Sequence, residues 1–251
     1  MNAFNPTQFR AQFPALADAG VYLDSAATAL KPQAVIDATH QFYCLSAGNV
    51  HRSQFAQAQR LTAQYEAARA KAARLLNAPD EKSIVWTRGT TEAINMVAQC
   101  YARPRLRPGD EIIVSVAEHH ANLVPWLMVA QQTGAQVIKL PLNDRRLPDV
   151  ERLPELITSR SRILALGQMS NVTGGCPDLA SAISAAHAAG MVVMVDGAQG
   201  AVHFPADVQQ LDIDFFMLFP LTNCMARPVS ACCTVSRSFL RRCRPGSAAA
   251  R

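Results

Sequence analysis

Residues 191–200 read MVVMVDGAQG, an apolar run followed by an acid and two glycines. A short apolar run bounded by turn residues is typical of a strand buried in a parallel sheet. Asp196 directly after the run is unusual, because a buried carboxylate is costly unless it is paired. The stretch therefore predicts a buried strand whose carboxyl end carries an acid in need of a partner.

The same alternation of apolar runs and amphipathic stretches continues on both sides, up to about residue 218. The expected strands are Val21–Leu23, Ser83–Thr87, Glu111–Ser115, Gln136–Leu140, Arg162–Leu166, Met191–Val195 and Asp214–Leu218. The expected helices are Pro32–Ser46, Ala56–Asn77, Thr91–Tyr101, Ala121–Thr133, Asp149–Thr158 and Asp178–Ala189. This order predicts an α/β fold, a mostly parallel sheet with helices on both faces.

Composition excludes several classes of protein. The chain has 251 residues, 49% hydrophobic and 17% charged, and no apolar run approaches the roughly 20 residues of a membrane span. The first residues lack the pattern of a secretory signal, so we expect a cytoplasmic protein without membrane contact. Neither a GxGxxG motif nor a P-loop is present, which argues against dinucleotide and nucleoside triphosphate sites of those types.

The net charge of +5 is concentrated at one end of the chain. Residues 1–214 carry a net charge of −1, whereas residues 215–251 contain six arginines, no lysine and no acid. Four of the seven cysteines also lie in that tail, without the spacing of a zinc site. The tail lacks the patterning of a nucleic-acid-binding arm, so we predict neither a nucleic-acid partner nor a metal. The alternative, a basic tail that acts as an interaction module, stays open.

Polar groups follow several of the expected strands, where ligands bind in such sheets. The segment RGTTEAIN brings Thr90 and Thr91 to the start of a helix, an arrangement suited to phosphate but also to ordinary capping. His119, in EHHANLVPW, could stack on a flat cofactor, bind metal or cap a helix. Asn171, in QMSNVTGG, could reach the same cleft or make a turn. For Asp196 a pyridinium nitrogen is a natural partner.

Taken together, these stretches resemble the class V, fold-type I pyridoxal-phosphate enzymes, and specifically the cysteine desulfurases. The resemblance covers residues 1 to about 218, which it identifies as the large domain of that fold, here incomplete. Selenocysteine lyases are close relatives, and kynureninase-like enzymes share the scaffold. The matching strings, in family order, are YLDSAATALKP, GNVHR, TRGTTEAIN, EHHANLVPW, SNVTG and VDGAQG.

The resemblance assigns roles to the residues of these strings. It implies that Thr90 and Thr91 hold the phosphate of pyridoxal 5'-phosphate and that His119 stacks on its ring and moves protons. Asp196 is implied to pair with the ring nitrogen. It also implies that Gln199 and Asn171 contact the cofactor. His51 and Arg52 are implied to lie near the substrate mouth.

The resemblance also implies a reaction and partners. Family members convert L-cysteine to L-alanine and leave the sulfur on an enzyme cysteine, for transfer to an acceptor protein in iron–sulfur cluster assembly or related pathways. It further implies a homodimer. L-cysteine and L-selenocysteine both stay open as substrates.

The chain departs from the family after about residue 219. The lysine that forms the Schiff base with the cofactor is missing, and so is the C-terminal domain with the nucleophilic cysteine. Plausible codons from Leu221 onward, read from the third base, give HKLYGPTGIGVLYG, so we hypothesise a single-base frameshift near residues 219–221. We therefore expect residues 219–251 to be an aberrant, disordered tail and the chain as written to be truncated and inactive. The alternative is a non-catalytic fragment that binds pyridoxal phosphate or dimerises.

Overall fold

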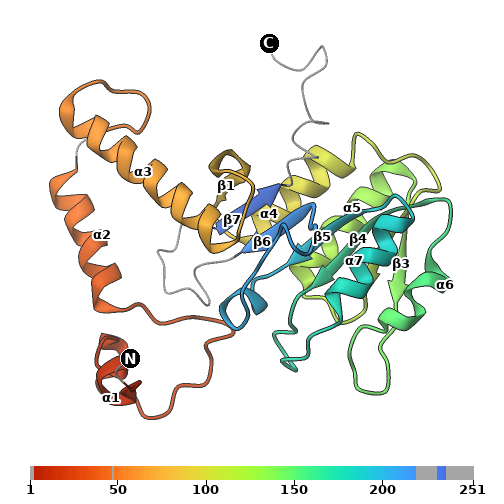
Figure 1. The fold of residues 1–251 in the computed structure, drawn as a ribbon, viewed down its shortest axis with the longest axis horizontal. Coiled ribbons are helices and arrows are strands. Elements are labelled where there is room, and N and C mark those ends of the chain that lie inside the picture. Colours follow the sequence, from red (N-terminus) through yellow and green to blue (C-terminus); the bar gives the residue numbers. More distant parts are fainter. Residues whose placement is uncertain (1–2, 47, 219–230, 236–251) are drawn as a thin grey trace.

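A computed structural model describes residues 3–46, 48–218 and 231–235 (Figure 1). The rest of the tail, and with it most of the predicted aberrant segment 219–251, lies outside the described residues. The described chain forms a twisted sheet flanked by helices, with an N-terminal arm, residues 4–45, that extends to one side of it.

The sheet has seven strands in the order β1-β7-β6-β5-β4-β2-β3. Five of them, β3, β2, β4, β5 and β6, are mutually parallel, which confirms the predicted mostly parallel α/β sheet. Their bounds agree with the expected strands to within one residue at each end. The seven strands are β1 (Ile84–Thr87), β2 (Glu111–Ser115), β3 (Gln136–Leu140), β4 (Ser161–Gly167), β5 (Val192–Asp196), β6 (Phe215–Leu218) and β7 (Ala231–Val235).

Strand β7 was not predicted from the sequence. It lies antiparallel between β1 and β6, with Thr87 opposite Ala231 and Leu218 opposite Cys232. The prediction that the whole tail is disordered therefore fails for these five residues. The reason is that β1 and β6 both leave backbone groups to be paired, and almost any extended segment can pair with them through its own backbone.

Helices cover both faces of the sheet, as the alternation of strands and helices predicts. Odd and even residues of the strands pack on opposite sides: Leu164 and Leu166 of β4 contact one layer, and Ile163 and Ala165 contact the other. The first layer contains α3 (Ala56–Leu75), α6 (Leu153–Leu156) and α7 (Leu179–Ala188). The second contains α4 (Thr90–Met96), its π-helical continuation Val97–Ala102, and α5 (Val124–Thr133).

Local sequence signals explain where these helices begin and end. Asp178 caps α7 by accepting a hydrogen bond from the Ser181 backbone N–H at 3.1 Å. After α5, Gly134 has a φ of +75°, the left-handed conformation that ends helices and favours glycine. Short 3₁₀ turns occur at Pro14–Leu16, Glu81–Ser83, His120–Asn122, Val150–Arg152 and Gly200–Val202.

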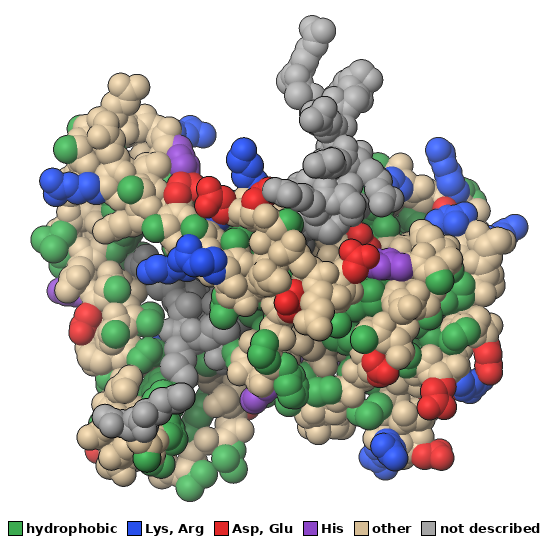
Figure 2. Space-filling model, in the orientation of Figure 1, with side chains coloured by type: hydrophobic (Ala, Val, Ile, Leu, Met, Phe, Trp, Pro, Cys, Tyr) green, Lys and Arg blue, Asp and Glu red, His purple; other side chains and the backbone are tan. Residues whose placement is uncertain are grey.

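The N-terminal arm is much less buried than the sheet. It consists of α1 (Pro6–Arg10), α2 (Gln33–Leu45) and the loops around them, and α2 has no buried residue. The predicted strand Val21–Leu23 is wrong: this stretch is a loop in which Val21 is 85% and Leu23 90% exposed. Its apolar pattern has no strand to pair with, and the Tyr22 hydroxyl instead donates to the Thr28 carbonyl at 2.6 Å. Figure 2 shows hydrophobic side chains on the surface of this arm.

Candidate functional site

A cavity of about 470 Å³ opens at the carboxyl ends of β2, β4 and β5 and the N-terminal end of α4. This is where parallel sheets bind their ligands. All six predicted cofactor residues line it, together with residues from the loop after Tyr22 and from the segment 146–148. The six are Thr90, Thr91, His119, Asn171, Asp196 and Gln199.

The start of α4 offers a polar end to the cavity. Gly89 precedes the helix without any side-chain cap, so Thr90 and Thr91 lie in the first turn, whose backbone N–H groups have no helical partner. Thr90 is buried, and its Oγ1 has no hydrogen-bond partner among the described residues. A buried hydroxyl rarely stays unpaired. This end of the cavity therefore fits an anion with several acceptor oxygens.

Asp196 ends β5 and lies opposite Gly167 of β4. It is only 9% exposed, and its Oδ1 accepts a hydrogen bond from the Ala198 N–H at 2.9 Å. Burial raises the pKa of this carboxyl, and the hydrogen bond and the neighbouring His119 act in the opposite direction. The turn that follows requires glycine, since a Cβ on Gly197 would lie 2.2 Å from Cζ of Phe216. Asp196 is thus a buried acid to which no cationic side chain of the described residues is hydrogen-bonded.

His119 and Glu118 follow β2 on the same side of the cavity. His119 is exposed, and its Nδ1 accepts a hydrogen bond from the Ala121 N–H at 3.1 Å, so it caps the turn that follows. The alternative that this histidine caps a helical turn is therefore observed. Because the cap uses Nδ1, Nε2 of the same ring can still contact another group. Glu118 accepts hydrogen bonds from the Gly167 N–H at 2.9 Å and from Asn122 Nδ2 at 2.6 Å.

Sequence reasoning missed Glu118. Burial, as the main cause, raises its pKa to about 7, while its two hydrogen bonds lower it and the charge of Asp196 raises it further. A signal was available in the sequence: Glu118 follows a buried strand closely, as Asp196 follows another, with Asn122 four residues later where helical turns bring side chains together.

Gln199 and Asn171 reach the cavity from two loops. Gln199 Nε2 donates to the Ala26 carbonyl at 3.0 Å, which ties the N-terminal segment to the end of the sheet. Asn171 lies in a turn in which Ser170 Oγ accepts from the Val172 N–H at 3.2 Å. The alternative that the residues around Asn171 form an ordinary turn is therefore also observed.

His51 and Arg52, the two residues expected near the substrate mouth, do not line the cavity. They lie in the connection between α2 and α3. There His51 Nε2 lies 2.9 Å from Oε1 of Glu66, and the His51 backbone has a φ of +62°. In this chain the structure does not bring them to the other predicted residues.

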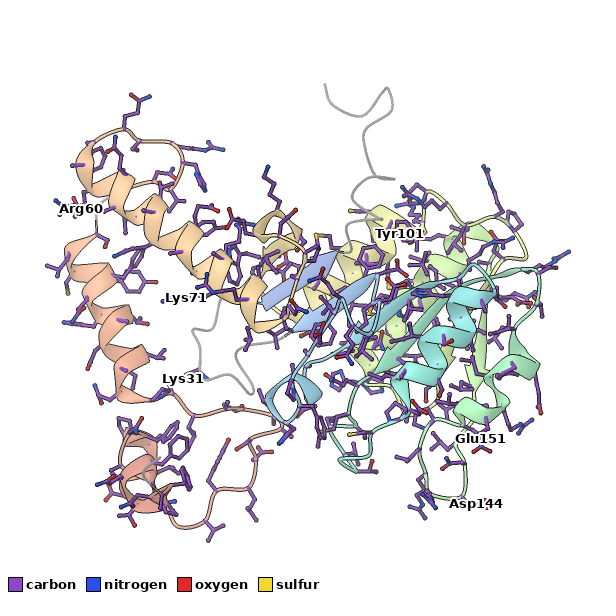
Figure 3. The ribbon with its side chains drawn as sticks, in the orientation of Figure 1. Lys31, Arg60, Lys71, Tyr101, Asp144 and Glu151 are labelled. Carbon is purple, nitrogen blue, oxygen red and sulfur yellow. The ribbon has the colours of Figure 1, made fainter. Side chains whose placement is uncertain are left out.

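None of the four lysines lines the cavity. Figure 3 shows Lys31 beside the start of α2 and Lys71 on α3. Lys31 donates a hydrogen bond to the Ala29 carbonyl, and burial lowers its pKa. The other two are Lys82, in the turn before β1, and Lys139, on β3. A lysine that could bond a cofactor is thus missing from the described walls of this cavity.

The described parts of the chain contain no group of three or more His, Cys, Asp or Glu side chains that could hold a metal ion. No helix within them has the length and hydropathy to cross a membrane.

Comparison with known proteins agrees with this geometry. The profile of the family described as "Aminotransferase class-V" matches residues 21–219. The chain belongs to the class V aminotransferase family. A similar relative within it is "Cysteine desulfurase CsdA" of Escherichia coli, 87% identical over 216 residues, which are 86% of this chain and 54% of that protein.

Solved structures of class V aminotransferases have the same fold. A crystal structure of CsdA from E. coli matches with a TM-score of 0.88 and 78% identity, over 95% of this chain and 60% of that one. The apo cysteine desulfurase of Thermococcus onnurineus matches with a TM-score of 0.90 and 26% identity, over 99% and 61%. The chain spans about half the length of the curated relatives it matches.

The two comparisons with CsdA differ in extent. The structural match covers more of this chain than the sequence match, 95% against 86%, at a lower identity of 78% against 87%. The residues that only the structural match adds therefore contribute few identities.

Proposed function

We propose that the cavity is a pyridoxal 5'-phosphate site of the cysteine desulfurase type. The observation that carries the proposal is that one cavity is lined both by the buried Thr90 hydroxyl, which has no hydrogen-bond partner in the described part of the chain, and by the buried carboxylate of Asp196. A phosphate at one end and a cationic ring nitrogen at the other satisfy both.

The residues present fit this group, and each has a distinct task. Thr90, Thr91 and the free N–H groups of the first turn of α4 would hold the phosphate. Asp196 would pair with the ring nitrogen. His119 would cover the ring, Gln199 its phenolic oxygen, and Asn171 the cofactor or the substrate carboxylate. When bound, pyridoxal phosphate supplies an electron sink for chemistry at the α-carbon of an amino acid.

For the parent protein we propose the desulfurase reaction, L-cysteine or L-selenocysteine to L-alanine with transfer of sulfur or selenium. The sequence similarity to CsdA supports this assignment. A sulfur-acceptor protein is then the partner, and a homodimer is the expected assembly. We propose a location in the cytoplasm and no nucleic-acid or membrane partner. His51 and Arg52 stay proposed for the substrate side, in the assembled enzyme.

For the chain as written we propose that no turnover occurs. No lysine lines the cavity among the described residues, and none of the 33 residues from 219 to 251 is a lysine. The end of the family match at residue 219 supports a shift of reading frame near residues 219–221. Residues 1–218 then form the large-domain part and residues 219–251 the aberrant tail.

A second candidate is a fragment that binds pyridoxal phosphate without catalysis. The grouping of all six predicted cofactor residues around one cavity favours it. Both candidates predict binding, and only the first concerns turnover by the intact parent.

Binding and turnover can be measured separately on this chain. We expect pyridoxine 5'-phosphate, which has no aldehyde to react with surface lysines, to bind in a calorimetric titration, and Thr90→Val and Asp196→Asn each to weaken it at least tenfold. Thr158→Val, on a turn outside the cavity, is the control. Alanine or sulfide formed from L-cysteine would refute inactivity, and no binding by the wild-type chain would refute the site.

The coding DNA tests the origin of the tail. We expect one inserted or deleted base near the codon of Phe219, with the restored frame encoding the missing lysine and a second domain. DNA that encodes the tail as written, with no open frame beyond it, would overturn the frameshift and leave the binding fragment as the protein's function.

A further inference from the structure

A chain of directed hydrogen bonds ends on Glu118 beneath the cavity. The indole Nε1 of Trp126 can only donate, and it donates to Asn122 Oδ1 at 3.0 Å. This fixes the orientation of the Asn122 amide, whose Nδ2 then donates to Glu118 Oε2 at 2.6 Å. Asn122 and Trp126 are both fully buried.

The other oxygen of Glu118 also receives a donor. Oε1 accepts from the Gly167 N–H at 2.9 Å, and Gly167 lies opposite Asp196 in the parallel pairing of β4 with β5. Since both oxygens accept, the arrangement suits an ionised carboxylate, while burial and Asp196 oppose ionisation. This part of the cavity wall thus holds two carboxyl groups, and no ion pair within the described residues joins a lysine or arginine to either of them.

The other charged groups near this part of the wall are few. His119 lies on the same segment as Glu118, and its charge acts on Asp196. Asp24 and Arg146 are the remaining charged side chains that line the cavity, each from a different loop. No hydrogen bond or ion pair of the described structure joins either of them to Glu118 or Asp196.

We propose that Glu118 is a second carboxylate for the ligand: its ionised form favours a ring that carries a positive charge beside Asp196, and its proton leaves as that ring binds. This inference rests on the proposed pyridoxal-phosphate site and adds a residue to it. Glu118 acts through its charge on the ring and on Asp196, so it is a positioning residue. The proton passes from the Glu118 carboxyl group to the buffer, and no other bond changes.

The test is a calorimetric titration of the full chain with pyridoxine 5'-phosphate at pH 7, in two buffers of different ionisation enthalpy. We expect the wild-type chain to release a larger fraction of a proton per ligand than Glu118→Gln. Between pH 6 and pH 8, the affinity of the wild-type chain should rise relative to that of Glu118→Gln by about three- to tenfold. An analogue with CH in place of the ring nitrogen should remove both differences.

Controls separate this inference from the function beneath it. Glu155→Gln should behave as wild type, because it removes an exposed carboxylate of α6 that pairs with Arg152 outside the cavity. If wild type binds the ligand and Glu118→Gln releases as many protons, the Glu118 proposal is wrong and the site stands. If wild type binds neither ligand, the site itself is wrong.

A second variant serves where Glu118→Gln does not fold. Asn122→Ala removes the donor to Oε2 and should raise the pKa of Glu118, moving the pH of greatest proton release upward from about 7. An unchanged pH of greatest release would overturn the proposal.

Discussion

The sheet and the N-terminal arm of this chain differ in how deeply their side chains are buried. Most residues of β4 and β5 are buried, and the strands end at the cavity, where Gly167 and Asp196 line its wall. In the arm, α2 has no buried residue and Val21 and Leu23 are almost fully exposed. The sheet therefore supplies its own stability, whereas the arm leaves apolar surface that a homodimer could cover.

The largest difference in stability between the sheet and the arm is expected for Trp126→Ala. Trp126 is fully buried and donates to Asn122, so the free energy of unfolding should fall by about 3–5 kcal/mol. Leu23→Ala, in the exposed loop of the arm, should change it by no more than about 0.5 kcal/mol. Urea unfolding followed by circular dichroism measures both. Equal losses would mean that the arm is packed in solution, for instance against a second copy.

Asp214→Ala tests how the sheet is joined to its helical layer. Asp214 Oδ2 accepts from the Val193 N–H at 2.9 Å and lies 3.0 Å from His187 Nε2 on α7. Its loss should cost about 1.5–3 kcal/mol, since it leaves a buried backbone donor unpaired. The control is Asp212→Asn. Asp212 contacts the same ring at the longer distance of 3.4 Å, and its side chain is 80% exposed, so its loss should matter little. A cost for Asp212→Asn as large as that for Asp214→Ala would contradict this account.

The pH dependence of stability depends on Glu118. Its pKa of about 7 in the folded chain exceeds the ordinary 4.5, so the folded state binds more protons than the unfolded state between these values. Stability should therefore fall as pH rises from about 4.5 to 7, by on the order of 2–3 kcal/mol. Thermal unfolding across this range should show a smaller fall for Glu118→Gln. The same pH slope in both proteins would show that Glu118 is not protonated in the folded chain.

The smallest effect is expected at the junction of the arm with α3. His51→Asn removes the exposed pair with Glu66 and keeps a residue type that tolerates the left-handed backbone. It should cost less than about 1 kcal/mol and leave the affinity for pyridoxine 5'-phosphate unchanged. A threefold or greater weakening, seen by calorimetry, would place His51 at the site in the assembled protein and reduce the contrast between arm and sheet.

The sequence alone determined the parallel part of the sheet and the walls of the cavity. Strands β5 and β6 lie in apolar runs of at least five residues, and the shorter apolar runs of β2, β3 and β4 are bounded by polar or turn residues; both signals are local. Thr90, Thr91, His119, Asn171, Asp196 and Gln199 each follow a strand, and the carboxyl ends of parallel strands share one edge of a sheet. Strand position alone was therefore enough to group them.

Only the tertiary structure decided the remainder, because it depends on partners far away in the chain. Val21–Leu23 has the pattern of a strand but no neighbouring edge, whereas Ala231–Val235, which was not predicted as a strand, pairs with β1 and β6. Glu118 accepts a hydrogen bond from Gly167, forty-nine residues further on, and its pKa is raised chiefly by the desolvation that the assembled cavity wall imposes. Backbone pairing and desolvation are properties of the assembled surroundings, so a local pattern can mark a candidate such as Glu118 but does not determine its environment.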